Sequence, residues 1–152
     1  MKAIYNFFGV VLLLFAVTMT GCEAEKDLMV IEGNLPIKTS TLYMVGDATP
    51  AGWDIGNPTA LTSSEEDPLI FFYEGHLNGG ELKCCLTPGN WDAPFIHPLT
   101  QGREIGKSGI SGENFQLYAG GDDLKWKVTE AGKYNLTFDL RNWIMKVTYL
   151  GK

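Results

Sequence analysis

The clearest pattern along the chain is an alternation of apolar and polar residues near its C-terminal end. Over residues 134–140, Tyr, Leu, Phe and Leu alternate with polar side chains, and the alternation returns over residues 143–149. A period of two is typical of a strand with one buried face. Only Arg141 and Asn142 separate the two segments, so they predict an antiparallel hairpin, with Trp143 in the inward set of its second strand.

Further short apolar segments precede this hairpin, each ended by residues that favour turns. The segments that predict strands are residues 41–45, 69–77, 81–86 and 124–128. Asn78, Gly79 and Gly80 join two of them in a second predicted hairpin. Loops are predicted at residues 47–58 and 88–91, which contain Pro and Gly, and the four glycines of residues 92–114 predict no regular element of length there.

Short strands, frequent turns and no convincing helix predict an all-β domain over residues 41–152, an immunoglobulin-like antiparallel β-sandwich. The composition agrees, because 18 glycines and 12% aromatic residues favour strands and turns. Trp126 stands between two lysines, so alternation turns its indole into the core.

The N-terminal residues have the pattern of a lipoprotein signal peptide. Lys2 precedes an apolar run over residues 7–17, and Thr20 and Gly21 stand directly before Cys22. The run is shorter than the about 20 residues that span a bilayer, and small residues before a cysteine favour cleavage and acylation. We therefore expect a signal peptide at residues 1–21 and a lipid on Cys22; the alternative is an apolar helix of the fold with a buried cysteine.

Residues 22–40 show no convincing period, and we expect them to tether the domain to the membrane. Residues 23–27 are mostly acidic and resemble the export tag that places Bacteroidetes lipoproteins on the outer face of the outer membrane. The alternative is a solvated linker.

The charge of the chain limits the class of partner. Removing residues 1–21 leaves 11 basic residues against 18 acidic ones, a net charge of −7. This charge argues against nucleic acid or an anionic lipid surface as a partner.

Catalytic and metal-binding patterns are poorly supported. His76 and His97 stand alone without ligand spacing, and neither has a setting that suggests a base for a serine nucleophile. Asp122 and Asp123 are expected to be solvated turn acids. We expect a protein that is not an enzyme, with no metal and no cofactor.

The remaining cysteines, Cys84 and Cys85, are neighbours on a predicted strand. Neighbouring residues of a strand face opposite sides, so a disulfide between them would be strained. We expect one core thiol and one surface thiol.

Two tryptophans differ from the others in their setting. Trp53 and Trp91 each stand in a turn that contains Pro or Gly, outside any alternation. An exposed indole is a flat apolar platform that suits the C–H face of a sugar ring. Lys83 lies on the predicted strand between them, where alternation turns Leu82 and Cys84 to the core and Lys83 outward; the alternative for Lys83 is a solubilising charge.

The order Trp53, Lys83, Trp91 resembles that of starch- and glycogen-binding modules built on immunoglobulin-like sandwiches. Residues 42–54 (LYMVGDATPAGWD) and 125–134 (KWKVTEAGKY) are more closely similar to the SusE/SusF family of surface lipoproteins from Bacteroidetes starch-utilisation systems. The resemblance covers residues 41–150 and the segment before Cys22.

This resemblance implies a non-catalytic lipoprotein of the outer-membrane surface that binds α-1,4-glucan. Trp53 and Trp91 would stack on glucose rings, and Lys83 would bind the hydroxyls between them. Two differences stand out: the chain has room for one module where the family commonly has two or three, and Leu82 and Cys84 replace the phenylalanines that usually flank the lysine. A further polar contact of the family cannot be placed within residues 92–123.

Two other functions fit the same residues. The exposed tryptophans could contact a protein partner, which would make the chain an accessory subunit of an outer-membrane uptake complex. They could also bind a different glycan, because flat aromatic rings fit many sugars.

Overall fold

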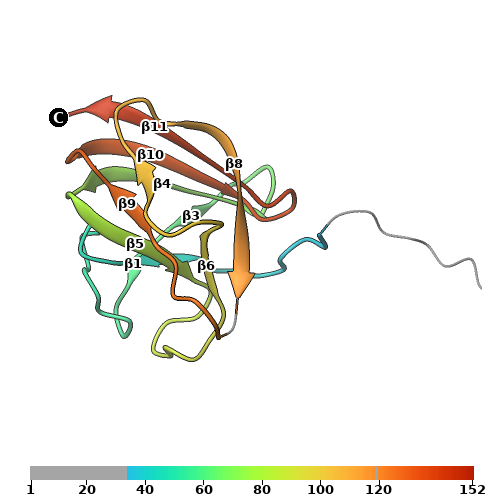
Figure 1. Ribbon diagram of the computed structural model, residues 1–152. Coiled ribbons are helices and arrows are strands. Elements are labelled where there is room, and N and C mark those ends of the chain that lie inside the picture. Colours follow the sequence, from blue (N-terminus) through green and yellow to red (C-terminus); the bar gives the residue numbers. More distant parts are fainter. Residues whose placement is uncertain (1–33, 119) are drawn as a thin grey trace, which may run out of the picture. The chain divides into compact units, whose positions relative to one another are not determined.

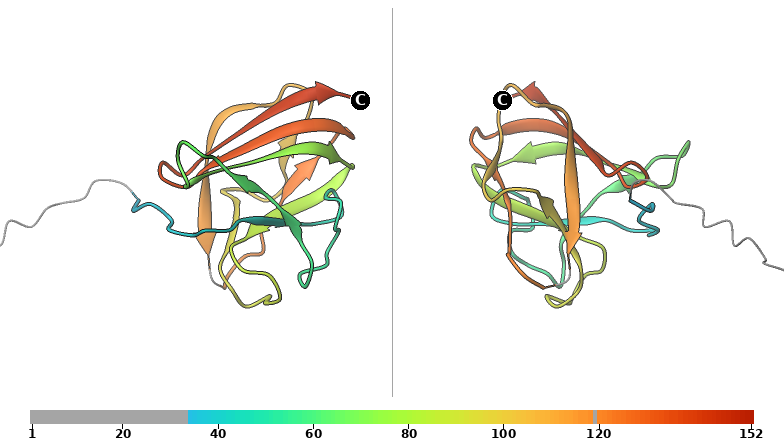
Figure 2. Two further views of the ribbon diagram at one scale, coloured as in Figure 1. Left: turned by 180° about the vertical axis from the view of Figure 1, so that it is seen from behind. Right: turned by 45° about the vertical axis from the view of Figure 1, so that its right-hand side comes forward.

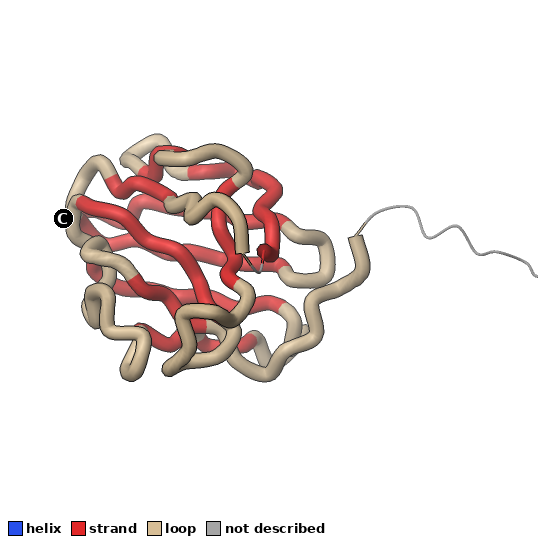
Figure 3. The backbone as a smooth tube through the Cα atoms, turned by 60° about the horizontal axis from the view of Figure 1, so that its bottom comes forward, coloured by secondary structure: helices blue, strands red, loops and turns tan. Residues whose placement is uncertain are grey.

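The computed structural model describes residues 34–118 and 120–152, which belong to the compact unit Gly33–Lys152. The predicted signal peptide, the acylation site Cys22 and the tether up to residue 33 lie outside the described residues. Within the described part the chain is all-β, and Figure 3 shows strands and loops without a helix. Accordingly, no helix there is long and apolar enough to cross a membrane.

The strands of the described residues are joined by connections of very different length, from Leu61 alone between β2 and β3 to residues 46–58 between β1 and β2 (Figure 1). They are β1 Tyr43–Val45, β2 Thr59–Ala60, β3 Thr62–Ser63, β4 Ile70–Leu77, β5 Gly80–Cys85, β6 Phe95–Pro98, β7 Arg103–Ile105, β8 Ile110–Tyr118, β9 Trp126–Val128, β10 Gly132–Asp139 and β11 Ile144–Gly151.

The strands form two layers that face each other (Figure 2). One layer contains β3, β4, β10 and β11, and the other contains β2, β1, β5 and β6. Strand β8 belongs to both, because its first half pairs with β11 and its second half pairs with β6. All pairings of the described strands are antiparallel except β7 with β9, and β9 in turn pairs with the first half of β5.

The core lies between the two layers and contains the residues that alternation turns inward. In β10, Tyr134, Leu136 and Phe138 are buried, and Leu136 pairs with Val147 of β11. Trp126 of β9 is fully buried and its ring contacts Phe138 at 5.8 Å between centroids. The predicted C-terminal hairpin and the predicted burial of Trp126 are therefore confirmed. Full burial of each large apolar side chain contributes about 1.5–3 kcal/mol.

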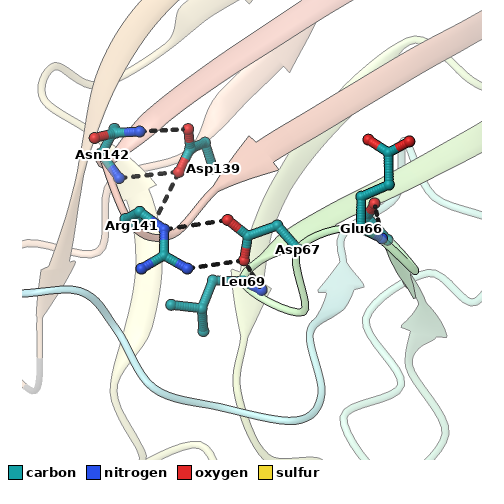
Figure 4. Close-up of polar contacts among 7 residues, drawn as sticks. Glu66, Asp67, Leu69, Asp139, Arg141 and Asn142 are labelled. Carbon is teal, nitrogen blue, oxygen red and sulfur yellow. Dashed lines mark hydrogen bonds and ion pairs between the residues drawn. The ribbon is translucent and has the colours of Figure 1, made fainter.

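An ion pair joins two loops at one end of the first layer (Figure 4). The Arg141 guanidinium donates two hydrogen bonds to Asp67, from Nε at 3.1 Å and from Nη2 at 3.0 Å. These bonds, followed by one from the Leu69 backbone N–H, lower the pKa of Asp67. Asp139 accepts hydrogen bonds from the backbone N–H groups of Arg141 and Asn142, which fixes the turn that presents the guanidinium.

Trp143 occupies a different position from the one predicted. It lies in the turn before β11 with a φ of 58° and not in the strand itself. Its ring stacks on Phe115 at 5.9 Å, and its Nε1 donates a 2.8 Å hydrogen bond to the Leu35 carbonyl oxygen. The backbone N–H of Ile37 also donates to the Leu140 carbonyl oxygen, and Ile37 is buried. Packing of the domain therefore begins before residue 41, inside the segment expected to be a tether.

The prediction that residues 92–114 contain no regular element of length was wrong, because the nine-residue strand β8 begins there. This segment contains β6, β7 and the first half of β8. Gly102 lies between β6 and β7 and Gly109 lies between β7 and β8, with φ of 70° and 66°. These glycines therefore form turns between the strands and do not interrupt them. Pairing with β5, β9 and β11 therefore determines the structure of a segment whose local sequence favours turns.

Candidate functional site

The candidate site lies on the face of the β1–β5–β6 layer that points away from the core. Leu82 and Cys84 of β5 enter the core, which leaves Lys83 and Cys85 on the opposite face. Val45 of β1 pairs with Lys83, and Phe95 of β6 pairs with Cys85. We call this surface the outer face; the loops after β1 and β5 lie beside it.

Lys83 is directed to the outer face as predicted, but it is not an exposed charge. The residue is only 6% exposed, and its Nζ donates a 2.6 Å hydrogen bond to Asp123 Oδ1. The same Nζ lies 3.9 Å from the ring centroid of Phe95 and 5.3 Å from that of Trp91, both within the range of cation–π attraction. Coverage by these two rings and by the loop before β9 explains the burial.

Asp123 is an exposed loop acid, as predicted, with its side chain 58% exposed, but it also bridges two lysines, which was not predicted. Its second carboxylate oxygen lies 2.8 Å from the Lys125 Nζ. Partial burial raises the pKa of Asp123, but hydrogen bonds from Lys125 and Lys83 outweigh this and lower it overall. The carboxylate therefore stays ionised between two ammonium groups. Lys125, in turn, places its Nζ 5.9 Å from the ring centroid of Trp53.

The two tryptophans singled out in the sequence lie beside each other. Trp53 is 40% exposed and Trp91 is 46% exposed. Their ring centroids are 6.5 Å apart and their planes are tilted by 42°. Trp91 also stacks on Phe95, with 5.8 Å between centroids and 14° between planes. The structure thus brings Trp53, Lys83 and Trp91 together.

Backbone contacts fix the loop that carries Trp53. The Gly46 N–H donates to the Gly52 carbonyl oxygen at 2.8 Å, and Asp47 Oδ1 accepts a 2.6 Å hydrogen bond from the Glu81 N–H. Gly46 has a φ of 139°, and a Cβ there would overlap the Glu81 carbonyl oxygen. Only glycine allows this close approach to β5.

The two loops that carry the tryptophans are also joined to each other. The Gly89 N–H donates a 2.6 Å hydrogen bond to the Ile55 carbonyl oxygen. Their relative position is therefore set by the backbone and not only by contact between the rings.

A hollow of about 510 Å³ is lined by Trp91 but not by Trp53, and we call it the Tyr118 hollow. Its lining combines aromatic and charged side chains with a glycine-containing wall: Lys83, Trp91, Asp92, Ala93, Phe95, His97, Tyr118, Gly120, Gly121, Asp122 and Asp123.

Sequence reasoning missed Phe95, His97 and Tyr118 as parts of this surface. All four residues of β6 are buried, so no alternation marks the strand. The exposed acid at position 123 gave no sign that it pairs with a lysine 40 residues away.

The expectation of a surface thiol at Cys85 was also wrong. Cys84 and Cys85 are both buried and free of a disulfide. Cys85 packs with Val45 and Phe95 beneath the loops of the outer face. Burial raises its pKa to about 11, although the nearby Lys83 ammonium acts in the opposite direction.

The chemistry that this surface offers is apolar stacking beside a few charged groups. Among the described residues, no group of three or more His, Cys, Asp or Glu side chains is placed to hold a metal ion. Comparison with protein-family models, with curated proteins and with solved structures finds no match for this chain.

Proposed function

We propose that the protein is a non-catalytic, lipid-anchored surface protein that binds α-1,4-glucan through Trp53, Trp91 and Lys83. In this proposal the all-β domain is an immunoglobulin-like carbohydrate-binding module similar to those of the SusE/SusF family. The anchor would be a lipid on Cys22 in the outer membrane, and the protein would serve a polysaccharide-utilisation system.

The observation that carries the proposal is the geometry of the tryptophan pair. Two half-exposed indoles at 6.5 Å and 42° offer two platforms at an angle, which suits a chain that curves from one ring to the next. Curved or cyclic glucans should bind more tightly than flexible linear ones, because they lose less conformational entropy on binding.

Lys83 supports the proposal in a more limited way than an exposed lysine would. An ammonium has three donors, and Asp123 accepts from one of them. The ammonium also lies 3.9 Å from the ring centroid of Phe95 and 5.3 Å from that of Trp91, and two donors remain for sugar hydroxyls. Aromatic contacts contribute about 0.5–1.5 kcal/mol each beyond the burial of apolar surface. With that burial and one hydrogen bond included, we expect a dissociation constant of about 0.1–1 mM.

Native gel electrophoresis in amylopectin tests the proposal. Purified full-length protein should be retarded, and Trp53→Ala should abolish most of the retardation. Phe72→Ala is the matched control, because Phe72 is 38% exposed but lies on β4, in the other layer.

Absence of retardation in the parent would exclude starch as the ligand and direct attention to other glycans or to a protein partner. Equal retardation of the parent and Trp53→Ala would place the glucan elsewhere on the surface. Circular dichroism of the parent and of each variant shows whether the fold persists, so that loss of binding can be distinguished from loss of structure.

A further inference from the structure

We propose that the Tyr118 hollow is a second sugar subsite, which takes a neutral hexose unit and disfavours an acidic one. The proposal rests on the proposed function, because the hollow lies next to Trp91 and would continue the same site.

The first argument is the position of Tyr118. It pairs directly with Phe95 across β6 and β8, so both side chains lie on the outer face. Phe95 stacks on Trp91, which contacts Trp53. The rings of Trp53, Trp91 and Phe95 therefore form a contacting series on the outer face. Tyr118 lies beside this series, with its ring 6.3 Å from that of His97 and the residue 50% exposed.

The second argument is the shape of the space beside Tyr118. A volume of about 510 Å³ falls within the range of about 300–1,000 Å³ that is usual for small-molecule sites. Gly121 packs so closely on the Tyr118 ring that a Cβ there would overlap it. The loop after β8 therefore forms a wall of the hollow at this ring.

The third argument is the pair of polar groups at its base. His97 Nδ1 lies 3.3 Å from the Pro98 carbonyl oxygen, and because a carbonyl can only accept, Nδ1 carries the proton. In the neutral ring, Nε2 is then an acceptor. Among the described residues Nε2 has no hydrogen-bond partner, and His97 lines the hollow.

Lys83 supplies a donor to the same space, so the hollow offers a donor and an acceptor. A sugar hydroxyl can donate and accept, and it therefore satisfies both groups. This is the pairing that orients a small ligand in a mostly apolar site.

The fourth argument is charge. Asp92, Asp122 and Asp123 line the hollow against the single ammonium of Lys83, and that ammonium is already paired with Asp123. Asp123 is also paired with Lys125, so the carboxylate of a uronic acid would face chiefly the carboxylates of Asp92 and Asp122. A neutral hexose has no such repulsion.

Nuclear magnetic resonance with ¹⁵N-labelled full-length protein locates the sugar. Maltotriose should shift the indole signals of Trp53 and Trp91 and also the backbone amides of His97, Tyr118 and Gly121. Indole shifts without shifts in the hollow would overturn this proposal and leave the proposed function standing. Shifts in the hollow without indole shifts would show a sugar site there but overturn both the proposed stacking on the tryptophans and the continuity of the two sites. The absence of both kinds of shift would overturn both proposals.

Affinities of variants give a second, independent measure. Tyr118→Ala should weaken maltotriose binding about two- to twelvefold, the range expected for one aromatic contact. Phe72→Ala, the control on the other layer, should leave the affinity unchanged. An unchanged affinity in Tyr118→Ala, with a loss in Trp53→Ala, would contradict the subsite.

Two single-ring probes of equal stereochemistry test the charge argument. Methyl α-D-glucoside should shift the amides of the hollow at a concentration at least about tenfold lower than methyl α-D-glucuronide, because placing like charges together is costly. The double variant Asp92→Asn and Asp122→Asn should narrow this difference. Equal binding of the two probes by the parent would overturn the preference for a neutral sugar.

Discussion

Lys83 of β5 and Asp123 of the loop before β9 are joined by a 2.6 Å hydrogen bond across 40 residues of sequence. The bond places a carboxylate directly over a buried ammonium that also contacts the ring of Phe95. Asp123 is shared with Lys125, which lies over Trp53. Asp123 thus contacts two lysines, of which Lys83 lies near the ring of Trp91 and Lys125 lies near the ring of Trp53.

Replacing Asp123 should destabilise the fold more than replacing an exposed acid usually does. Asp123→Ala leaves the buried Lys83 ammonium without a carboxylate partner. We expect a loss of about 1–2 kcal/mol in the free energy of unfolding, with solvent access to Asp123 limiting the effect. Urea denaturation of the parent and the variant measures the difference.

A double-mutant cycle with Lys83→Met supplies the control. Once the ammonium is absent, removal of Asp123 should cost less, and the two changes should be coupled by about 1 kcal/mol. Additive effects of the two substitutions would contradict an energetic link between these side chains.

Much of the fold follows from local sequence pattern. The alternation over residues 134–149 predicts the β10–β11 hairpin because each of these strands has one buried face, as the burial of Tyr134, Leu136 and Met145 confirms. Strand β6 is different: its residues are covered on both sides, so they have no period that could be recognised.

The candidate site is predictable only in part, for a related reason. Trp53 and Trp91 stand out because glycine- and proline-containing turns expose them, and the structure places the two rings together. The burial of Lys83 depends on Phe95 and Asp123, which approach it from distant segments. Such long-range pairing leaves no local signal in the sequence.

Acid should weaken the fold partly through Asp67. Hydrogen bonds from Arg141, and then from the Leu69 N–H, lower the pKa of Asp67 in the folded state. A carboxyl with a lowered folded-state pKa stabilises the fold above its unfolded value of about 3.9, and this contribution disappears as the pH falls through the lower folded value. Asp67→Asn should therefore reduce the slope of stability against pH below about pH 4.

Urea denaturation between pH 3 and pH 7 measures that slope. Some slope should remain in the variant, since the pKa of Glu74 is also lowered, chiefly by a hydrogen bond from Lys133. Glu66→Gln is the matched control, because Figure 4 shows the Glu66 carboxylate pointing away from Arg141. An identical slope in the parent and Asp67→Asn would show that the ion pair has no part in acid unfolding.

The two adjacent thiols should be unreactive in the native protein. Cys84 and Cys85 are buried, and burial, as the largest influence, raises the pKa of Cys85 to about 11. At pH 8 only about one thousandth of that thiol would be the reactive thiolate. Iodoacetamide at pH 8 should label neither cysteine until urea is added, as peptide mass mapping would show. Rapid native labelling of Cys85 would mean that the loops of the outer face open readily.

The close approach of Gly46 to β5 should make this position intolerant of any side chain. Gly46→Ala would place a Cβ against the Glu81 carbonyl oxygen at a φ of 139°, and we expect a loss of about 3 kcal/mol or more in the free energy of unfolding. Gly52→Ala is the matched control, because Gly52 also has a positive φ, 62°, but open space around it. Its cost should be about 1 kcal/mol, from backbone conformation alone.

Chemical denaturation measures the free energy of unfolding of both variants. The Trp53 indole resonance should move in Gly46→Ala only, because the hydrogen bond from the Gly46 N–H to the Gly52 carbonyl oxygen closes the loop that carries this ring. Equal costs for the two substitutions would mean that the loop can move away from β5 without loss, and that its contact with Glu81 does not hold Trp53 in place.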